Sequence, residues 1–349
     1  MRVIPACVTI PRQSGYGMPA EWAPHEATWV AWPSHEDLWG DNLGPARAAF
    51  ARLVRAIAQG ERVEVLVPDE DQERLARAAL PGGRVRLHRI PFGDIWLRDT
   101  APIFLTKDGE RQSVRFRFNG WGGKYVLEHD DVVAARIAHF VGGAERAMHF
   151  VLEGGAVDVD GEGSALTTRQ CLLNPNRNGA VEVSVVEAWL CDALGVERVL
   201  WLGDGLLNDH TDGHVDTVVR FVRPGVVVAM EPRSEDDPNR GVLLELLREA
   251  SAMVDARGRA IEVVRIPSPG RVLDSEGRVM PASYVNFYIA NASVVVPTYG
   301  APWDAEAVER IGALFPGRRT VAIDARDILT GGGAFHCITQ QQPAGGQRS

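Results

Sequence analysis

Hydrophobic residues recur along the chain in two alternating patterns. Short apolar and β-branched runs that end at glycine, proline or acidic residues predict strands, and segments with apolar residues three or four positions apart predict amphipathic helices. Helices are expected at residues 46–58, 71–79, 131–140, 181–193, 240–255 and 304–315. Strands are expected at residues 26–33, 63–67, 85–90, 103–105, 114–118, 164–168, 199–202, 217–222, 226–228, 261–267, 284–289, 293–296 and 320–323. The segment 150–157 is expected to be an apolar strand that ends in a loop with glutamate and two glycines.

The predicted elements repeat as units. In each unit an apolar strand ends in a short loop with glycine or an acidic residue, one or two β-rich runs follow, and a helix comes next. Such self-similar units are typical of radial or solenoid arrays. The chain begins with strand and helix segments and ends with strands, so its two ends can complete one unit and close a ring that leaves few sheet edges exposed. A doubly wound open sheet is the alternative, but the paired strands within the units favour the ring.

The composition fits an ordinary globular α/β protein with a substantial core, because 45% of the 349 residues are hydrophobic and 24% are charged. Closed α/β architectures of this size are often single domains. We therefore expect one domain over residues 1–349, with a surface arm at 1–15 and a disordered tail at 343–349. The start of the chain does not resemble a secretory signal, and no stretch has the roughly 18 apolar residues of a membrane helix.

The formal net charge of −9 argues against nucleic acid as a partner, since a basic stripe would be expected for that function. The charge is compatible with a small cationic substrate that is attracted into an acidic cleft. A solvated acidic surface explains the charge equally well.

The cysteines, Cys7, Cys171, Cys191 and Cys337, are widely spread. They show neither a CxxC pair nor a Cys/His ligand spacing, so a zinc site and a disulfide framework are both disfavoured. We expect a cytoplasmic protein with free thiols and no metal.

Three consecutive glycines, Gly331 to Gly333, precede Cys337 near the C-terminus. Glycine suits a backbone that turns sharply or lets a ligand approach closely. We interpret Cys337 as a nucleophile that this loop presents at the start of a strand, Ile338-Thr339. The alternative is a buried cysteine that packs as a small hydrophobic residue.

Acidic and histidine side chains occupy the equivalent loop of the other units. The candidates are Asp99, Glu153, His214 with its neighbours Asp212 and Asp216, and the thiol of Cys337. In a ring, equivalent loops converge on the axis, so these groups would share one cavity. Structural roles are the alternative, since loop carboxylates often cap turns and a histidine can be a satisfied core residue. His336 is not assigned as the base, because in an extended segment it would point away from Cys337.

The acidic surroundings favour a cationic substrate. Carboxylates raise the pKa of a nearby thiol, which would not suit a protease. They do suit a guanidinium group, which pairs bidentately with carboxylates and would stabilise the thiolate when it binds. The thiolate would attack the guanidinium carbon, and His214 would protonate departing ammonia and then activate water, which leaves a ureido product. This chemistry requires the sulfur to lie within about 10 Å of the imidazole.

Aromatic side chains could line such a pocket and contact a cationic chain face-on. Trp96, Trp121 and Tyr288 are the candidates, and core packing is the alternative for each.

Several motifs resemble those of the agmatine deiminases and the related bacterial peptidylarginine-deiminase group. They include Asp94-Ile95-Trp96-Leu97-Arg98-Asp99-Thr100, Phe118-Asn119-Gly120-Trp121-Gly122-Gly123, Leu152-Glu153-Gly154-Gly155, Asp212-Gly213-His214-Val215-Asp216 and the segment from Gly331 to Gln341. The resemblance extends from about residue 16 to 343, and further motifs lie at residues 18–22, 24–29, 171–178 and 283–291.

This resemblance implies the five-bladed pseudo-symmetric α/β propeller (pentein fold) of the guanidine-modifying superfamily, without cofactor or metal. It implies hydrolysis of agmatine to N-carbamoylputrescine and ammonia by a homodimer or larger assembly. Carried over motif by motif, Cys337 is the nucleophile and His214 the general acid/base. Asp99 and Asp216 bind the guanidinium, and Glu153 supports the histidine.

The chain departs from the usual family pattern at Ala334, at Phe335 and in the segment 206–211, so the substrate could be another guanidine. A site for free arginine would need a cation for the α-carboxylate, and Arg98 and Arg177 are candidates. A Cys-His hydrolase of amides and an inactive protein that binds polyamine-like cations remain as alternatives.

Overall fold

The computed structural model describes residues 15–345, and within this range the strands form five sheets. One sheet has four strands in the order β16-β1-β2-β3, and the others are β4-β5-β6, β7-β8-β9, β10-β11-β12 and β13-β14-β15. The strands are β1 (His25–Ala31), β2 (Arg62–Val67), β3 (Val85–Arg89), β4 (Ile103–Lys107), β5 (Glu110–Arg117), β6 (Ala144–Val151), β7 (Asp158–Val159), β8 (Ser164–Thr168), β9 (Arg198–Leu202), β10 (Val219–Arg223), β11 (Val226–Glu231), β12 (Glu262–Pro267), β13 (Tyr288–Ile289), β14 (Ser293–Thr298), β15 (Arg319–Asp324) and β16 (Gln340–Pro343).

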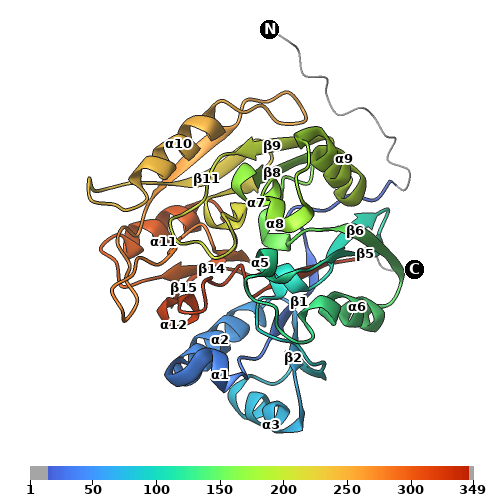
Figure 1. Ribbon diagram of the computed structural model, residues 1–349. Helices are drawn as coiled ribbons and strands as arrows, with labels where there is room; N and C mark the ends of the chain where they lie inside the picture. Colours follow the sequence, from blue (N-terminus) through green and yellow to red (C-terminus); the bar gives the residue numbers. More distant parts are fainter. Residues whose placement is uncertain (1–14, 346–349) are drawn as a thin grey trace.

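The long helices lie at the periphery of the molecule and the strands lie further in (Figure 1). The helices are α1 (Glu36–Trp39), α2 (Leu43–Ile57), α3 (Glu70–Ala79), α4 (Leu97–Thr100), α5 (Gly120–Gly123), α6 (Asp130–Val141), α7 (Arg169–Leu172), α8 (Pro175–Asn178), α9 (Val183–Leu194), α10 (Arg240–Ser251), α11 (Asp304–Ala313) and α12 (Arg326–Leu329). Short 3-10 turns are η1 (Gly40–Asn42), η2 (Gly154–Ala156) and η3 (Val215–Thr217).

Each sheet has the same ββαβ plan. Its first two strands pair antiparallel, its third runs parallel to the second, and a helix connects those two. This connection is needed because parallel neighbours cannot be joined by a tight hairpin. The predicted repeat of paired strands followed by a helix is therefore confirmed, and a single doubly wound sheet is wrong.

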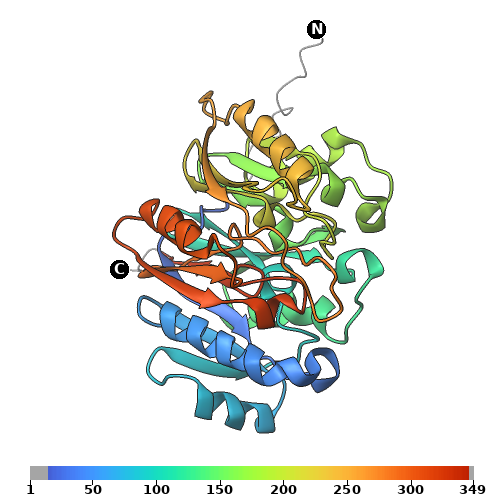
Figure 2. The same cartoon turned by 90° about the vertical axis from the view of Figure 1, so that its left-hand side faces the viewer.

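The two ends of the described chain meet in one sheet. The C-terminal strand β16 pairs antiparallel with β1, and the Trp29 indole N–H donates to Gln342 Oε1 at 2.8 Å. Figure 2 shows the N-terminal helix α2 packed beside the C-terminal unit, where it contacts β14, β15 and α12. The completion of one unit by both ends, expected from the sequence, is observed.

The six predicted helices form, as α2, α3, α6, α9, α10 and α11, whereas the short helices α1, α4, α5, α7, α8 and α12 were not predicted. Most of the six carry an apolar stripe that becomes buried, although α3 buries only Ala76. On α2, for example, Phe50, Leu53, Val54 and Ile57 are all buried. Within residues 15–345, no helix is long and apolar enough to cross a membrane.

Three expected boundaries are wrong. The disordered tail expected at 343–349 is wrong for its first two residues, since Pro343 pairs with His25 and the backbone N–H of Ala344 donates to Pro24. The rest of that segment from 346 on, and the surface arm expected at 1–15 apart from Gly15, lie outside the described residues. The strand predicted at 284–289 is reduced to Tyr288–Ile289, because the preceding residues form turns instead of a ladder. Ile338-Thr339 is not a strand either, and the ladder begins at Gln340.

Candidate active site

The five predicted catalytic residues each follow the last strand of a sheet, whereas Trp121 follows the middle strand β5 and Tyr288 lies within β13. Asp99 follows β3, Glu153 follows β6, His214 and Asp216 follow β9, and Cys337 follows β15. The carboxyl ends of strands are where open α/β sheets place their ligands. The fourth sheet, after β12, contributes Asn286, a residue that the sequence analysis did not assign to the site.

Cys337 lies in a turn that is held from several sides. The side-chain amide of Asn286 donates to Sγ at 3.1 Å, and Sγ lies 3.6 Å from Asp216 Oδ2. The backbone carbonyl of Cys337 accepts from the N–H of Arg98 at 3.1 Å. A Cβ at Gly333 would stand only 3.0 Å from Sγ, so this glycine leaves the room in which the thiol sits.

His214 and the two aspartates converge on the backbone of Gly155. His214 Nδ1 lies 3.8 Å from Asp99 Oδ1, which also accepts the N–H of Gly155 at 2.9 Å. A Cβ at Gly155 would stand 2.5 Å from His214 Nδ1, 3.0 Å from Asp99 Oδ1 and 3.1 Å from Asp216 Oδ2. Only glycine therefore lets the imidazole and both carboxylates come together.

The thiol and the imidazole meet the distance requirement that the sequence analysis set. Sγ is 3.6 Å from Asp216 Oδ2, which is 3.1 Å from the position of a Gly155 Cβ, and that position is 2.5 Å from His214 Nδ1. Even if these three distances were added along a straight line, Cys337 Sγ and His214 Nδ1 would be less than about 10 Å apart, which is within the limit that the proposed chemistry sets.

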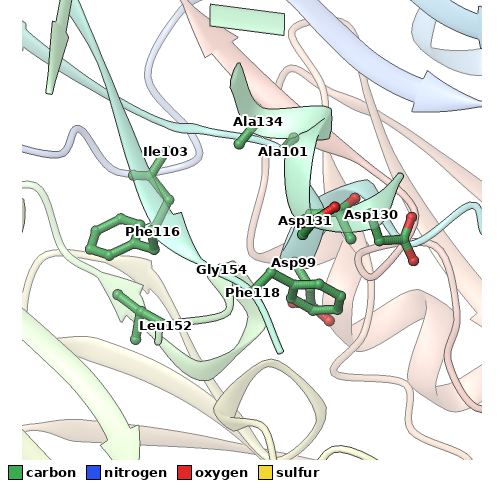
Figure 3. Close-up of a pocket in the computed structure, with 11 residues that line it drawn as sticks. Asp99, Ala101, Ile103, Phe116, Phe118, Asp130, Asp131, Ala134, Leu152 and Gly154 are labelled. Carbon is green, nitrogen blue, oxygen red and sulfur yellow. The ribbon is translucent and has the colours of Figure 1, made fainter. Parts of the chain in front are cut away.

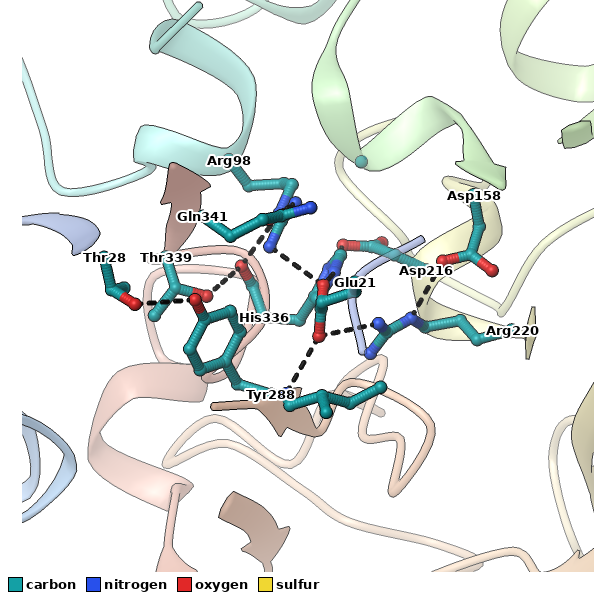
Figure 4. Close-up of polar contacts among 12 residues, drawn as sticks. Glu21, Thr28, Arg98, Asp158, Asp216, Arg220, Tyr288, His336, Thr339 and Gln341 are labelled. Carbon is teal, nitrogen blue, oxygen red and sulfur yellow. Dashed lines mark hydrogen bonds and ion pairs between the residues drawn. The ribbon is translucent and has the colours of Figure 1, made fainter. Parts of the chain in front are cut away.

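His336 approaches the site, contrary to the expectation that it points away. Its Nδ1 lies 2.7 Å from Asp216 Oδ2 and its Nε2 lies 2.7 Å from Glu21 Oε2 (Figure 4). The expectation assumed an extended backbone, whereas the backbone turns here and Thr339 N–H donates to the carbonyl of His336. The same network includes Arg98 and Arg220, which pair with Glu21 at 3.2 and 2.9 Å.

Glu153 is held by an arginine. The Nε of Arg177 donates to Glu153 Oε1 at 2.7 Å, and both side chains are fully buried. Asp212, expected to bind substrate, is occupied by protein cations, since Arg177 Nη1 and Lys124 Nζ both pair with it. Its carboxylate thus fastens the loop before His214, and the pKa of Asp212 is lowered because these hydrogen bonds outweigh its burial.

Two of the three predicted pocket aromatics contact the site. The Trp121 indole donates to Asp99 Oδ2 at 2.9 Å. Trp96 lies against the glycine loop, where a Cβ at Gly333 would meet its ring at 2.8 Å. Tyr288 is instead fully buried with its hydroxyl 2.7 Å from Thr28 Oγ1, which is the packing role that the sequence left open.

Burial and charge push the pKa values of the site apart. Burial, with the negative charges of Asp216 and Asp99, raises the pKa of the Cys337 thiol well above its usual value. Burial alone would lower the pKa of His214, but Asp99, Cys171 and Glu153 reverse this and hold it well above the usual value. Burial and neighbouring acids raise the pKa of Asp99. Burial opposes ionisation of Asp216, yet its hydrogen bond to His336 and the nearby positive charges lower its pKa.

A pocket borders the site, and Asp99 is one of its lining residues. It is lined by Phe116, Phe118, Leu152, Asp130 and other residues of β5, α4 and α6 (Figure 3). Neither Cys337 nor His214 lines it. This pocket is therefore not where the thiol would react.

Asn286, His336 and Gly155 were not assigned to the site from the sequence, and Arg177 was considered only as a partner for a substrate carboxylate, not as the partner of Glu153. Asn286 occupies the fourth equivalent loop, so a strict search of that loop position would have found it. Gly155 is signalled by the paired glycines after Glu153. His336 and Arg177 carry no such signal, because their contacts join residues 120 and 24 positions apart.

Comparisons with known proteins identify the family to which the chain belongs. Residues 17–343 match the family described as Porphyromonas-type peptidyl-arginine deiminase. The chain is 43% identical to the agmatine deiminase of Stutzerimonas stutzeri, with 96% of this chain and 97% of the relative covered. It is 41% identical to that of Pseudomonas aeruginosa at 96% and 97% coverage.

A solved structure shares the fold over nearly the whole length. The agmatine deiminase of Enterococcus faecalis superposes with a TM-score of 0.90 at 35% identity, with 98% of this chain and 99% of that chain covered. The chain therefore belongs to the Porphyromonas-type peptidyl-arginine deiminase family, the family of the agmatine deiminases that it resembles.

Proposed function

We propose that this protein is an agmatine deiminase, a C–N hydrolase that converts agmatine and water to N-carbamoylputrescine and ammonia. The observation that carries the proposal is the position of a thiol 3.6 Å from one carboxylate, with a second carboxylate and an imidazole gathered around Gly155. Two acids at this spacing suit the flat, five-donor guanidinium head. The similarity to agmatine deiminases supports agmatine as the guanidine.

In the first half of the reaction, Asp99 and Asp216 hold the guanidinium, the Cys337 thiol releases its proton to solvent, and the thiolate attacks the central carbon of the guanidinium. A C–S bond forms, one C–N bond breaks, and His214 donates the proton with which ammonia departs. The raised pKa of His214 supports this role, because the imidazole then carries a proton at neutral pH. The product of this step is a thiouronium on Cys337.

In the second half, water attacks the same carbon. His214, now neutral, takes one proton from the water. The C–S bond breaks, and the departing sulfur takes the second water proton, which restores the thiol of Cys337. The ureido product is neutral at its head group, so its attraction to Asp99 and Asp216 is lost and it can dissociate.

The positive charge of the substrate activates the thiol of Cys337. Without substrate, the pKa of Cys337 is raised by burial and by the two aspartates, so the thiol is protonated and unreactive. A bound guanidinium offsets those negative charges and stabilises the thiolate. The reagent's charge should therefore matter: a cationic haloacetamidine should label Cys337 faster than neutral iodoacetamide, and Asp99→Asn should shrink that difference.

Agmatine is favoured over free arginine because Arg98 and Arg177, the candidate partners for an α-carboxylate, are already bonded within the protein. Arg98 is buried and bonded to Glu21 and Gln341, and Arg177 is bonded to Glu153, Asp212 and the carbonyl of Thr211. Neither guanidinium is free to bind an α-carboxylate. Peptidyl arginine and other alkylguanidines use the same reaction and are separate arms of the test.

The test is ammonia release from agmatine, arginine and a peptidyl arginine at equal concentration, with Cys337→Ser as control. We expect release from agmatine, much less from arginine, and none from the variant. A mass spectrum of enzyme quenched during turnover should place an amidino adduct on Cys337. Full activity of the variant, or no release from any guanidine by the wild type, contradicts the proposal.

Three finer features belong to the same proposal. We place the five ββαβ sheets as blades of one five-bladed ring, supported by the shared plan and by the pairing of β16 with β1. A homodimer is proposed from the family resemblance, and light scattering would test it. A cytoplasmic location is proposed because a catalytic thiol must stay reduced.

A further inference from the structure

A second cysteine lies beside the catalytic histidine. Cys171, on α7, is fully buried, and Glu153, Cys171 and His214 each present a ligand-type atom such that all three atoms lie within 4.8 Å of one another. These residues are 18 and 43 positions apart along the chain, so no sequence spacing reveals the group. Carboxylate, thiolate and imidazole are the three ligand types that Zn²⁺ takes from proteins.

Two members of the group have polar atoms without partners. Among residues 15–345, neither ring nitrogen of His214 has a hydrogen-bond partner, and neither does Glu153 Oε2. Glu153 is fully buried and His214 is 1% exposed. Buried polar atoms are seldom left unsatisfied without a functional reason such as a role in catalysis or a place for an ion. The proposed reaction uses one nitrogen of His214 but gives no partner to Glu153 Oε2.

The neighbours hold these groups as metal ligands are commonly held. Arg177 bonds Glu153 Oε1 at 2.7 Å and leaves Oε2 open. Asp99 lies 3.8 Å from His214 Nδ1, which leaves Nε2 as the nitrogen for an ion. Ligating carboxylates and imidazoles usually have such outer partners. Tetrahedral zinc needs ligand atoms roughly 3.5 Å apart, so closure requires side-chain shifts of only about one ångström.

We propose that Glu153, Cys171 and His214 form an inhibitory site for Zn²⁺ or a similar thiophilic divalent cation. Binding displaces the thiol proton of Cys171 and one of the two ring N–H protons of the His214 imidazolium, and both protons pass to solvent. Bonds form from the ion to sulfur, to the freed imidazole nitrogen and to one carboxylate oxygen. His214 can then no longer exchange protons with the reacting groups. The inhibition rests on the proposed function, whereas the binding itself does not.

A cobalt titration tests binding without measuring activity. Cys337→Ser removes the other nearby thiol, and Co²⁺ added to this variant should give a thiolate-to-cobalt charge-transfer band in the near ultraviolet. The band should disappear when Cys171→Ser is added and should persist when Cys191→Ser, on α9, is added instead. No band, or a band that survives Cys171→Ser, overturns the proposal.

Two further measurements keep the proposal falsifiable. If the double variant does not fold, crystals of Cys337→Ser soaked in zinc should show an anomalous peak at Cys171, and a peak only elsewhere refutes the site. In activity assays, Zn²⁺ should inhibit the wild type reversibly with EDTA, and Cys171→Ser should need at least about tenfold more Zn²⁺ for the same inhibition. If the protein does not turn over agmatine but binds cobalt through Cys171, only the proposed function is refuted, and the metal site stands.

Discussion

His336 and Asp216 are joined by a 2.7 Å contact between Nδ1 and Oδ2, the same carboxylate oxygen that the thiol of Cys337 approaches at 3.6 Å. His336, the neighbour of Cys337 in sequence, is therefore linked to the thiol through a carboxylate from another unit. Because His336 also contacts Glu21, it ties the N-terminal segment to the site.

The first prediction concerns this contact. In His336→Gln the pKa of Asp216 should rise, because burial, which raises it, would no longer be opposed by His336. Asp216 must be ionised to bind a guanidinium, so the acidic limb of the kcat/KM profile should move to higher pH. Activity at the optimum should fall by about a hundredfold as Asp216 loses its position.

His88→Gln is the matched control. His88, on β3, also contacts a carboxylate, that of Glu64 on β2, at 2.7 Å, but it has no contact with Asp216 or the thiol. It should lower stability but leave the pH profile unchanged. An unshifted acidic limb in His336→Gln would show that His336 has a structural role only.

The second prediction concerns Gly155. An alanine Cβ there would overlap His214 Nδ1 at 2.5 Å and crowd Asp99 and Asp216. Gly155→Ala should reduce kcat/KM by at least about a hundredfold and cost about 1–3 kcal/mol of stability. Gly241→Ala on α10 has no atom within 4 Å of its Cβ and should leave activity intact. Wild-type turnover by Gly155→Ala would mean that the imidazole and carboxylates need not lie this close.

The third prediction concerns the buried Asp130, beside the pocket of Figure 3. Burial raises its pKa from 3.8 to about 7, although it accepts the N–H groups of Gly93 and Asp94. A carboxyl with a raised pKa stabilises the fold fully below pH 3.8, and this contribution is lost as the pH rises to about 7. The free energy of unfolding should thus fall across this range by on the order of 2–4 kcal/mol from Asp130 alone.

Asp130→Asn keeps the oxygen acceptor and should flatten that pH dependence, measured by urea unfolding at pH 5 and pH 8. The neighbouring Asp131 is exposed, so Asp131→Asn should leave the wild-type slope. Equal slopes in wild type and Asp130→Asn would contradict the raised pKa.

The fourth prediction concerns Asp94, which accepts the indole N–H groups of Trp39 at 3.0 Å and Trp96 at 2.7 Å. Both rings lie against Gly331, where a Cβ would meet them within 3.0 Å, and the Trp96 ring also lies against Gly333 beside the thiol. Asn has one acceptor oxygen, so Asp94→Asn should release one indole, change tryptophan fluorescence and alter the rate at which haloacetamidine labels Cys337. An unchanged labelling rate would show that the glycine loop does not depend on this pair.

The sequence alone determined the repeat and most of the chemistry. Apolar periodicity located the helices to within a few residues, because each stripe has one buried face wherever the unit lies. Ordered motifs predicted Asp99, Glu153, His214, Asp216 and Cys337 as site residues, and the structure places Asp99, His214, Asp216 and Cys337 close to one another.

The tertiary structure decided how those loops meet. The backbone turns at His336, so its side chain points toward the site and not away from it as an extended segment would require. Asp212 pairs with Arg177 and Lys124 and not with a substrate. The junction of Glu153, Cys171 and His214 follows from how separate sheets pack, since it joins residues that no periodicity or spacing relates. A local pattern predicts a helix or strand because residues close in sequence lie on the same face of that element. Contacts between units depend instead on how whole sheets are positioned, which no local pattern shows.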